Sequence, residues 1–193
     1  MSTWRCLGRC LALAAGLAAV ALAACGGGGG GGGPTAPPPP PPTGVSFTVA
    51  GPSGTNSIFL AAGASPTTNC LVLEVRASEV TDLYAVSLDL KFPRNIIRFE
   101  ADGTRKGDFL RQQGIRTELL VANKPKGNLV IGYSRLGEVA GVDGSGLLFQ
   151  LEFSAQADGS GDFVIEENEA FDSTGEVQAD VSWISGSVNV VLP

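Results

Sequence analysis

Carboxylates are the residues that could carry acid–base chemistry in this chain, because none of its 193 residues is a histidine. Imidazole general bases, His-containing zinc sites and Ser-His-Asp triads are therefore excluded. Glu166, Glu167 and Glu169 lie close together in sequence, and a pair of carboxylates is what a glycosidase needs. Successive residues of a strand point to opposite faces, and the chain has few aromatic residues to line a sugar-binding cleft. We interpret these glutamates as a solvated strand edge and predict that the protein is not an enzyme.

Short Asp-Gly turns raise a second chemical possibility, because aspartates and backbone carbonyls are the oxygen ligands that calcium prefers. The clearest case is Asp158 to Asp162, which enclose only glycine and serine. An EF-hand loop needs oxygen ligands at alternating positions and a bidentate glutamate at the twelfth. This spacing does not match, so the sequence predicts no metal site and no cofactor in this chain.

The N-terminal residues are typical of a secretory signal peptide. Arg5 and Arg9 precede an apolar stretch, residues 11–22, that is too short to cross a hydrocarbon core about 30 Å thick. The following Leu22-Ala23-Ala24-Cys25 resembles the lipobox of bacterial lipoproteins. The resemblance implies that residues 1–24 are cleaved off and that Cys25 is the lipid attachment site. Several acyl chains on one cysteine make such an anchor durable.

Residues 25–44 are expected to be a tether between this anchor and a folded domain. Gly26 to Gly33 form a flexible coil and Pro37 to Pro42 a stiff polyproline rod, with lengths of about 16 Å and about 19 Å. No aspartate directly follows Cys25. By the same resemblance, the protein is expected in the cell envelope, lipid-anchored at the outer membrane or cell surface.

Residues 45–193 are long enough for one domain with a full core. Cys6 and Cys10 leave with the signal peptide and Cys25 carries lipid, so no disulfide framework is expected. Cys70 opens an apolar stretch, and we interpret it as a small packed residue, because no histidine is present to activate it as a nucleophile.

The charge of the chain is acidic and unevenly distributed. The formal net charge is -6, and removal of Arg5 and Arg9 leaves eleven basic residues against nineteen acidic ones. This balance argues against nucleic acid as a partner. Residues 136–193 hold eleven acidic residues and no basic one. Such a surface either keeps the domain soluble or helps to dock a partner, and the sequence leaves both open.

Alternating apolar residues predict strands throughout the domain. The clearest runs are Val86 to Phe92 and Leu147 to Phe153, in which every second residue is apolar, as expected for strands with one buried face. Similar runs occur at 45–50, 57–62, 71–77, 96–100, 118–122, 129–134, 163–166 and 188–192. Glycine-containing turns separate many of them. The sequence therefore predicts an all-β jelly-roll β-sandwich of about nine to ten strands.

Several stretches of this domain resemble the cohesin family. The run from Leu83 to Ile97, with its FPRN turn, is similar to the cohesin strand that leads into a YDPN turn. Residues 107–110 and 146–153 resemble a glycine-containing segment and a glycine-led core strand of that family. The closing stretch NEAFDSTGEVQADVSWISGSVNVV, residues 168–191, is the best match.

The resemblance implies a noncatalytic module that binds a dockerin-type protein domain through one sheet face, with any calcium held by the partner. The outward residues of two strands occupy the matching region, and the candidate partner-binding residues are Ser87, Asp89, Lys91 and Arg135. The best-known cohesins present an asparagine and an aspartate where this chain has Ala85 and Ser87. Asp89 is the expected substitute acceptor.

Two other functions remain open at this point. A carbohydrate-binding module that holds a polysaccharide would need coplanar exposed aromatic rings, and the candidates are Tyr84, Tyr133 and Trp183. A structural envelope lipoprotein would need neither these rings nor a docking face.

Overall fold

The computed structural model describes residues 43–193. The predicted signal peptide, Cys25 and all but the last two residues of the predicted tether lie outside the described residues. In the described part, the chain forms eleven strands and one short 3-10 helix, η1 (Gln112–Gly114). None of the helical structure found in residues 43–193 is long and apolar enough to cross a membrane.

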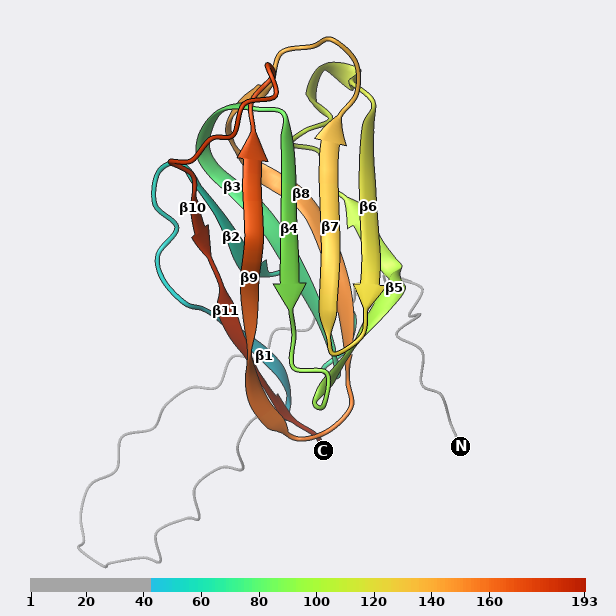
Figure 1. Cartoon of the computed structure of the whole chain (residues 1–193). Helices are drawn as coiled ribbons and strands as arrows, with labels where there is room; N and C mark the ends of the chain where they lie inside the picture. The colour runs from blue at the N-terminus through green and yellow to red at the C-terminus, as the bar shows by residue number, and fades with distance from the viewer. Residues whose placement is uncertain (1–42) are drawn as a thin grey trace, which may run out of the picture.

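The strands lie in two facing sheets (Figure 1). The six-stranded sheet has the order β1 (Gly44–Val49), β11 (Gly186–Val191), β9 (Gly159–Phe171), β4 (Ala85–Lys91), β7 (Asn128–Arg135) and β6 (Thr117–Lys124). The five-stranded sheet has the order β10 (Ser182–Ile184), β2 (Ser57–Ala62), β3 (Cys70–Leu83), β8 (Val142–Ala155) and β5 (Ile97–Lys106). Only the pairing of β10 with β2 is parallel in this part of the chain.

This architecture confirms the predicted all-β jelly-roll sandwich. The strand number differs slightly, because β10 (Ser182–Ile184) has only three residues, too few to show an alternating pattern. Four strands are also longer than their apolar runs: β3, β5, β8 and β9. Their extensions pass through register shifts or glycine-rich ends, where the alternation is lost.

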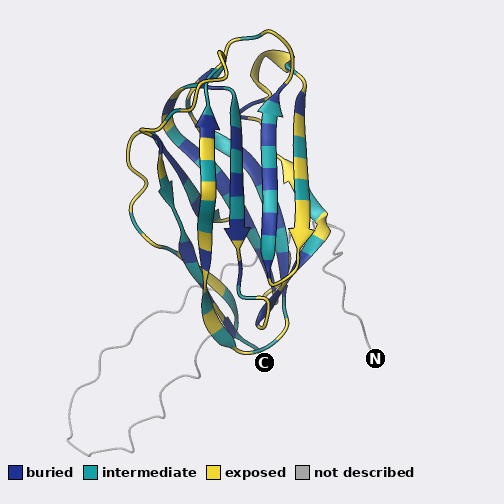
Figure 2. Ribbon diagram, in the orientation of Figure 1, coloured by how far each residue is buried: buried dark blue, intermediate teal, exposed yellow. Residues whose placement is uncertain are grey.

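The core fills the space between the sheets with the apolar residues of each alternating strand (Figure 2). Leu88 and Leu90 of β4 face inward, as do Leu151 and Phe153 of β8. The ring of Phe153 packs against Phe163 of the opposite sheet at 5.1 Å between centroids. It also contacts Phe92 and Phe99 at 5.3 and 5.7 Å. The edge-to-face contact with Phe163 joins the two sheets, while Phe99 belongs to β5, the neighbour of β8 in the same sheet.

Cys70 is buried at the start of β3, as its apolar neighbourhood predicted. It is also disulfide-bonded. The expectation that the chain contains no disulfide is therefore wrong. The three other cysteines, to which that expectation assigned cleavage or lipidation, lie outside the described residues.

Candidate functional site

The outward side of β9, β4, β7 and β6 forms one continuous surface, which we call the four-strand face. It faces the reader in Figure 1, with the other sheet behind it. The residues that pair across the four strands are, row by row, Phe171, Ala85, Ser134 and Glu118; Glu169, Ser87, Gly132 and Leu120; Glu166, Asp89, Val130 and Ala122; Val164, Lys91, Asn128 and Lys124. Residues between these positions, such as Leu88 and Ile131, are buried. The alternation of each strand thus separates the core from this surface.

Three of the four predicted partner-binding residues lie on the four-strand face. Ser87, Asp89 and Lys91 follow one another at alternate positions of β4. The Asp89 carboxylate accepts a hydrogen bond of 2.8 Å from Asn128 Nδ2 on the neighbouring strand. Lys91 Nζ lies 2.5 Å from a Glu166 carboxylate oxygen on the other side. Asp89 and Lys91 are therefore held in place by neighbouring strands.

Arg135 does not lie on this face, and its prediction as an outward residue is wrong. The side chain is buried, and Nη1 donates a hydrogen bond of 2.7 Å to the carbonyl of Leu110. Arg135 follows Tyr133 by two positions, so it shares the inward phase of the buried Leu129, Ile131 and Tyr133. The outward residues of β7 are the ones between them, from Asn128 to Ser134.

A β-bulge in β9 places two glutamates on the four-strand face. Glu169 pairs with Ser87 and Glu166 pairs with Asp89, so three steps along β9 match two steps along β4. The extra residue is accommodated by Glu167, whose backbone is left-handed, with a positive φ of 44°. Strict alternation would have put Glu166 and Glu169 on opposite sides. The bulge instead gathers Glu166, Glu169 and Asp89 into one acidic strip.

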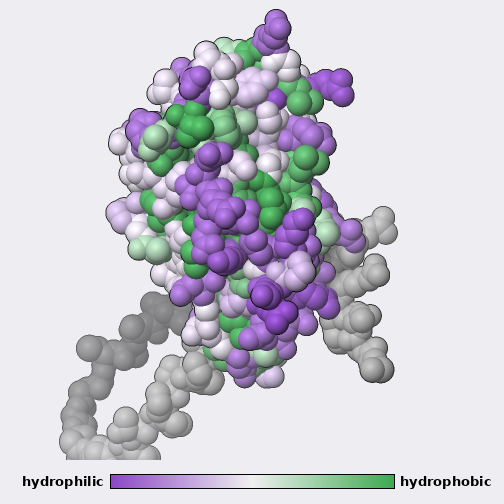
Figure 3. Space-filling view, in the orientation of Figure 1, coloured by the Kyte–Doolittle hydropathy of each residue, from purple (hydrophilic) through white to green (hydrophobic). Residues whose placement is uncertain are grey.

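The β7 and β6 side of the face is less polar. Leu120 is 65% exposed and lies beside Gly132, while Val130 and the exposed Ala122 form the next row. Figure 3 shows this division: hydrophilic residues gather over β9 and β4, and hydrophobic ones lie beside them over the upper part of β7 and β6, above the hydrophilic lower ends of these two strands. Sequence reasoning missed Leu120, although it is the one large apolar residue in phase with Glu118 and Lys124.

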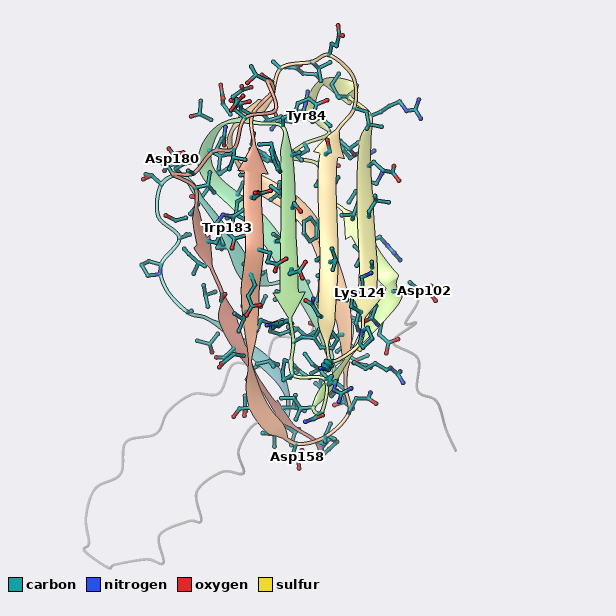
Figure 4. All side chains as sticks on the ribbon, in the orientation of Figure 1. Tyr84, Asp102, Lys124, Asp158, Asp180 and Trp183 are labelled. Atoms are coloured by element: carbon teal, nitrogen blue, oxygen red, sulfur yellow. The ribbon has the colours of Figure 1, made fainter. Side chains whose placement is uncertain are left out.

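The three aromatic candidates for sugar binding do not come together. Tyr133 is buried, and its hydroxyl donates to the Gly107 carbonyl at 3.1 Å. Tyr84 Oη donates to the Gly137 carbonyl at 2.7 Å, at the end of the sandwich where β4 begins. Trp183 packs against the core from β10, well away from Tyr84 (Figure 4). These residues form no shared platform for stacking on sugar rings.

Two aspartates order the loops at the β4 start of the sandwich. Asp82 accepts hydrogen bonds from Ser173 Oγ at 2.8 Å, from the Ser173 amide at 3.2 Å and from the Gly141 amide at 2.7 Å. The Ser173 hydroxyl is the main cause that lowers the pKa of Asp82 below its usual value. Asp172 likewise accepts from the Thr174 hydroxyl, which lowers the pKa of Asp172. Within residues 43–193, no three His, Cys, Asp or Glu residues gather closely enough to hold a metal ion.

Comparison with known proteins identifies the fold. No family model and no curated protein matches this chain. Among solved structures, a non-cellulosomal cohesin from the archaeon Archaeoglobus fulgidus matches with a TM-score of 0.51 and 16% identity, over 77% of this chain and 92% of that one. The second type II cohesin of the ScaA scaffoldin of Acetivibrio cellulolyticus gives 0.55 and 12%, over 77% and 97%. A type II cohesin–X-dockerin complex from Acetivibrio cellulolyticus gives 0.53 and 12%, over 74% and 95%. The chain therefore has a cohesin-like fold.

Proposed function

We propose that this protein is a noncatalytic docking module that holds a dockerin-type protein domain on its four-strand face. The observation that supports the proposal most directly is the composition of that face. It places the acidic strip of Asp89, Glu166 and Glu169 on β4 and β9, and the exposed apolar Leu120 on β6, with only β7 between them. A polar strip beside an apolar patch is the usual make-up of a protein interface. The cohesin-like fold supports the same choice.

The face also defines the chemistry of its partner. Asp89, Glu166 and Glu169 favour a partner surface with basic or hydrogen-bond-donating side chains. Leu120 and Val130 favour an apolar contact in the centre of that surface. A helix with apolar residues along one side and lysine or arginine at its flank meets both demands. Any calcium in the complex belongs to the partner in this proposal.

The anchor is the second part of the proposal. Lipid on Cys25 would hold the docking module at the cell envelope, at the outer membrane or the cell surface, with residues 26–44 as the spacer. Incorporation of labelled palmitate into the wild-type chain, and its loss in Cys25→Ser, tests this part alone. A Cys25→Ser chain that still takes up label and remains in the membrane fraction would contradict it.

The docking proposal is tested by capture from secreted and envelope proteins of the source organism. Residues 43–193 hold both sheets and the whole described core, so they serve as bait, in calcium and in chelator. We expect a partner that is retained only with calcium and lost from Ser87→Arg and Asp89→Arg. Thr48→Arg is the matched control, because Thr48 is an exposed residue of β1, at the opposite edge of the same sheet.

The outcomes separate the alternatives. A calcium-dependent partner that binds Ser87→Arg and Asp89→Arg as well as wild type would contradict the four-strand face as its site. Binding to immobilised polysaccharide without any protein partner would replace docking with the carbohydrate-binding alternative. Failure to bind either would leave the structural envelope role.

A further inference from the structure

Strand β6 forms one edge of the six-stranded sheet, with β7 as its only neighbour in that sheet. The Arg116 carbonyl accepts from the Leu136 amide of the neighbouring chain segment. Backbone groups alternate in direction along a strand. Glu118, Leu120, Ala122 and Lys124 therefore direct their N–H and C=O groups toward β7. Thr117, Leu119, Val121 and Asn123 direct theirs away from the sheet.

At both ends of this row of outward backbone groups, pairing with another strand is restricted. At the start, Lys106 Nζ donates to the Thr117 carbonyl at 2.6 Å and also lies 3.4 Å from a Glu118 carboxylate oxygen. At the end, Pro125 follows β6 and has no N–H to offer. Between them, no hydrogen bond from another described residue is recorded for the outward groups of Leu119, Val121 and Asn123. The edge thus has a short stretch, residues 119–123, whose outward backbone donors and acceptors can pair with another strand.

The sequence of β6 is complementary to itself in one antiparallel register. When two copies are centred on Val121, Val121 meets Val121, and Leu119 meets Asn123 of the other copy. These are the residues with outward backbone groups, so each such pair exchanges both N–H···O=C bonds. On the four-strand face, Glu118 then lies opposite Lys124, and Leu120 opposite Ala122.

We propose that β6 is a self-association edge, through which two copies of this chain pair antiparallel about Val121. Lys124 takes part in none of the ion pairs found within residues 43–193. The register gives it an anionic partner, Glu118 of the other copy. It also covers Leu120, the most exposed large apolar residue of the described chain. Opposite charges directly across paired strands stabilise the pairing, and like charges there destabilise it.

The two-fold axis of this pair runs perpendicular to the sheet. Both four-strand faces therefore point in the same direction and join into one surface across the paired β6 strands. This inference does not depend on the proposed function, because the pairing uses only the edge of the sheet and a second copy.

The test is the solution mass of residues 43–193 as a function of concentration, measured by sedimentation and light scattering. We expect a reversible dimer whose dissociation constant rises at least about tenfold in Lys124→Glu, since each copy then places Glu118 opposite a glutamate. The double variant Glu118→Lys with Lys124→Glu restores opposite charges and restores the dimer. A mixture of the two single variants forms heterodimers. Lys126→Glu is the matched control, because this substitution makes the same charge change in the turn after β6, outside the paired strands.

Val121→Pro tests the backbone separately. It removes an outward N–H that β7 does not use, so dimerisation is lost while the far-ultraviolet spectrum of the folded domain is kept. A wild-type chain that stays monomeric at the highest concentration reached overturns the proposal. So does a dimer that persists unchanged in both Lys124→Glu and folded Val121→Pro, because it must then use another surface.

Discussion

Arg135 shows how a single charged side chain serves the fold from inside. Its guanidinium is buried and donates to the Leu110 carbonyl, so it ties β7 to the segment that precedes η1. Loss of the charged donor leaves a buried carbonyl without its hydrogen bond, which costs more free energy than the loss of a typical exposed polar contact. Asp89, by contrast, keeps part of its surface in solvent on the four-strand face. Substitution of Arg135 should therefore lower stability, and substitution of Asp89 should instead weaken partner binding.

We expect Arg135→Ala to lower the free energy of unfolding by about 2 kcal/mol, measured by urea denaturation. The folded fraction should still capture a partner of the four-strand face, because Arg135 does not lie on it. Arg94→Ala, at an exposed position without a recorded ion pair in residues 43–193, is the control and should change stability by less than about 0.5 kcal/mol. A stable Arg135→Ala that fails to bind would restore Arg135 as a binding residue.

Glu152 is a carboxylate whose charge opposes folding. It lies opposite Glu100 in the register of β8 and β5. Burial, and then the charge of Glu100, raise the pKa of Glu152 above its ordinary 4.5. A raised carboxyl pKa means that the folded state holds the proton more tightly than the unfolded state. The protonated Glu152 thus stabilises the folded state. This stabilisation is complete below the pKa that Glu152 has in the unfolded chain, and it is lost as the pH rises through the higher pKa of the folded state.

Glu152→Gln removes this charge. We expect the variant to be more stable than wild type at pH 7, by a few tenths to about 1 kcal/mol. The gain should disappear below about pH 4, where wild-type Glu152 is already protonated. Thermal unfolding across this pH range measures both points. Equal stability of the two proteins at every pH would show that neither burial nor Glu100 acts on Glu152 as described.

At the scale of the element, the bulge in β9 sets the composition of the four-strand face. Its extra residue, Glu167, adopts a left-handed backbone with φ 44, which disfavours side chains with a Cβ branch and suits glycine. We expect Glu167→Gly to stabilise the domain by up to about 1 kcal/mol and Glu167→Val to destabilise it by about 1 kcal/mol. Glu167→Gln keeps the shape and tests the charge alone. A Glu167→Val chain as stable as Glu167→Gln would show that the bulge is absent in solution.

Elements with one clear alternating run could be predicted from the sequence, and those with irregular backbone could not. Val86 to Phe92 indicated β4 because each second residue is apolar. The three residues of β10 are too few for any period, so this strand was missed. The joint placement of Glu166 and Glu169 depends on the bulge, and one inserted residue reverses the facing of all positions beyond it.

The candidate site was predictable only to the level of the strand. The alternation of β4 correctly separated Ser87, Asp89 and Lys91 from the core, which their positions in the structure confirm. Arg135 was assigned to the outward side of its strand, although its phase matches the buried Tyr133. Phase was the better guide, because the pleat fixes the direction of a side chain before its polarity matters.

At the scale of the whole molecule, the aromatic contacts between the sheets hold the sandwich together. Phe153 of β8 is fully buried and touches Phe163 of the opposite sheet. We expect Phe153→Ala to lower the free energy of unfolding by about 3–5 kcal/mol, measured by chemical denaturation. Phe59→Ala is the control: Phe59 is only partly buried, so its loss should cost less. A smaller effect at Phe153 than at Phe59 would contradict the central place of this cluster.

The pairing of the first strand has a mechanical consequence. Gly44 lies opposite Val191 and Val49 opposite Gly186, so β1 runs antiparallel along the whole length of β11. A pull on residue 43 along the axis of β1, against a load fixed on the four-strand face, acts on all of these backbone bonds at once. They resist together in shear and do not open one after another. The sandwich is thus built to bear force at the point where its first strand, β1, begins.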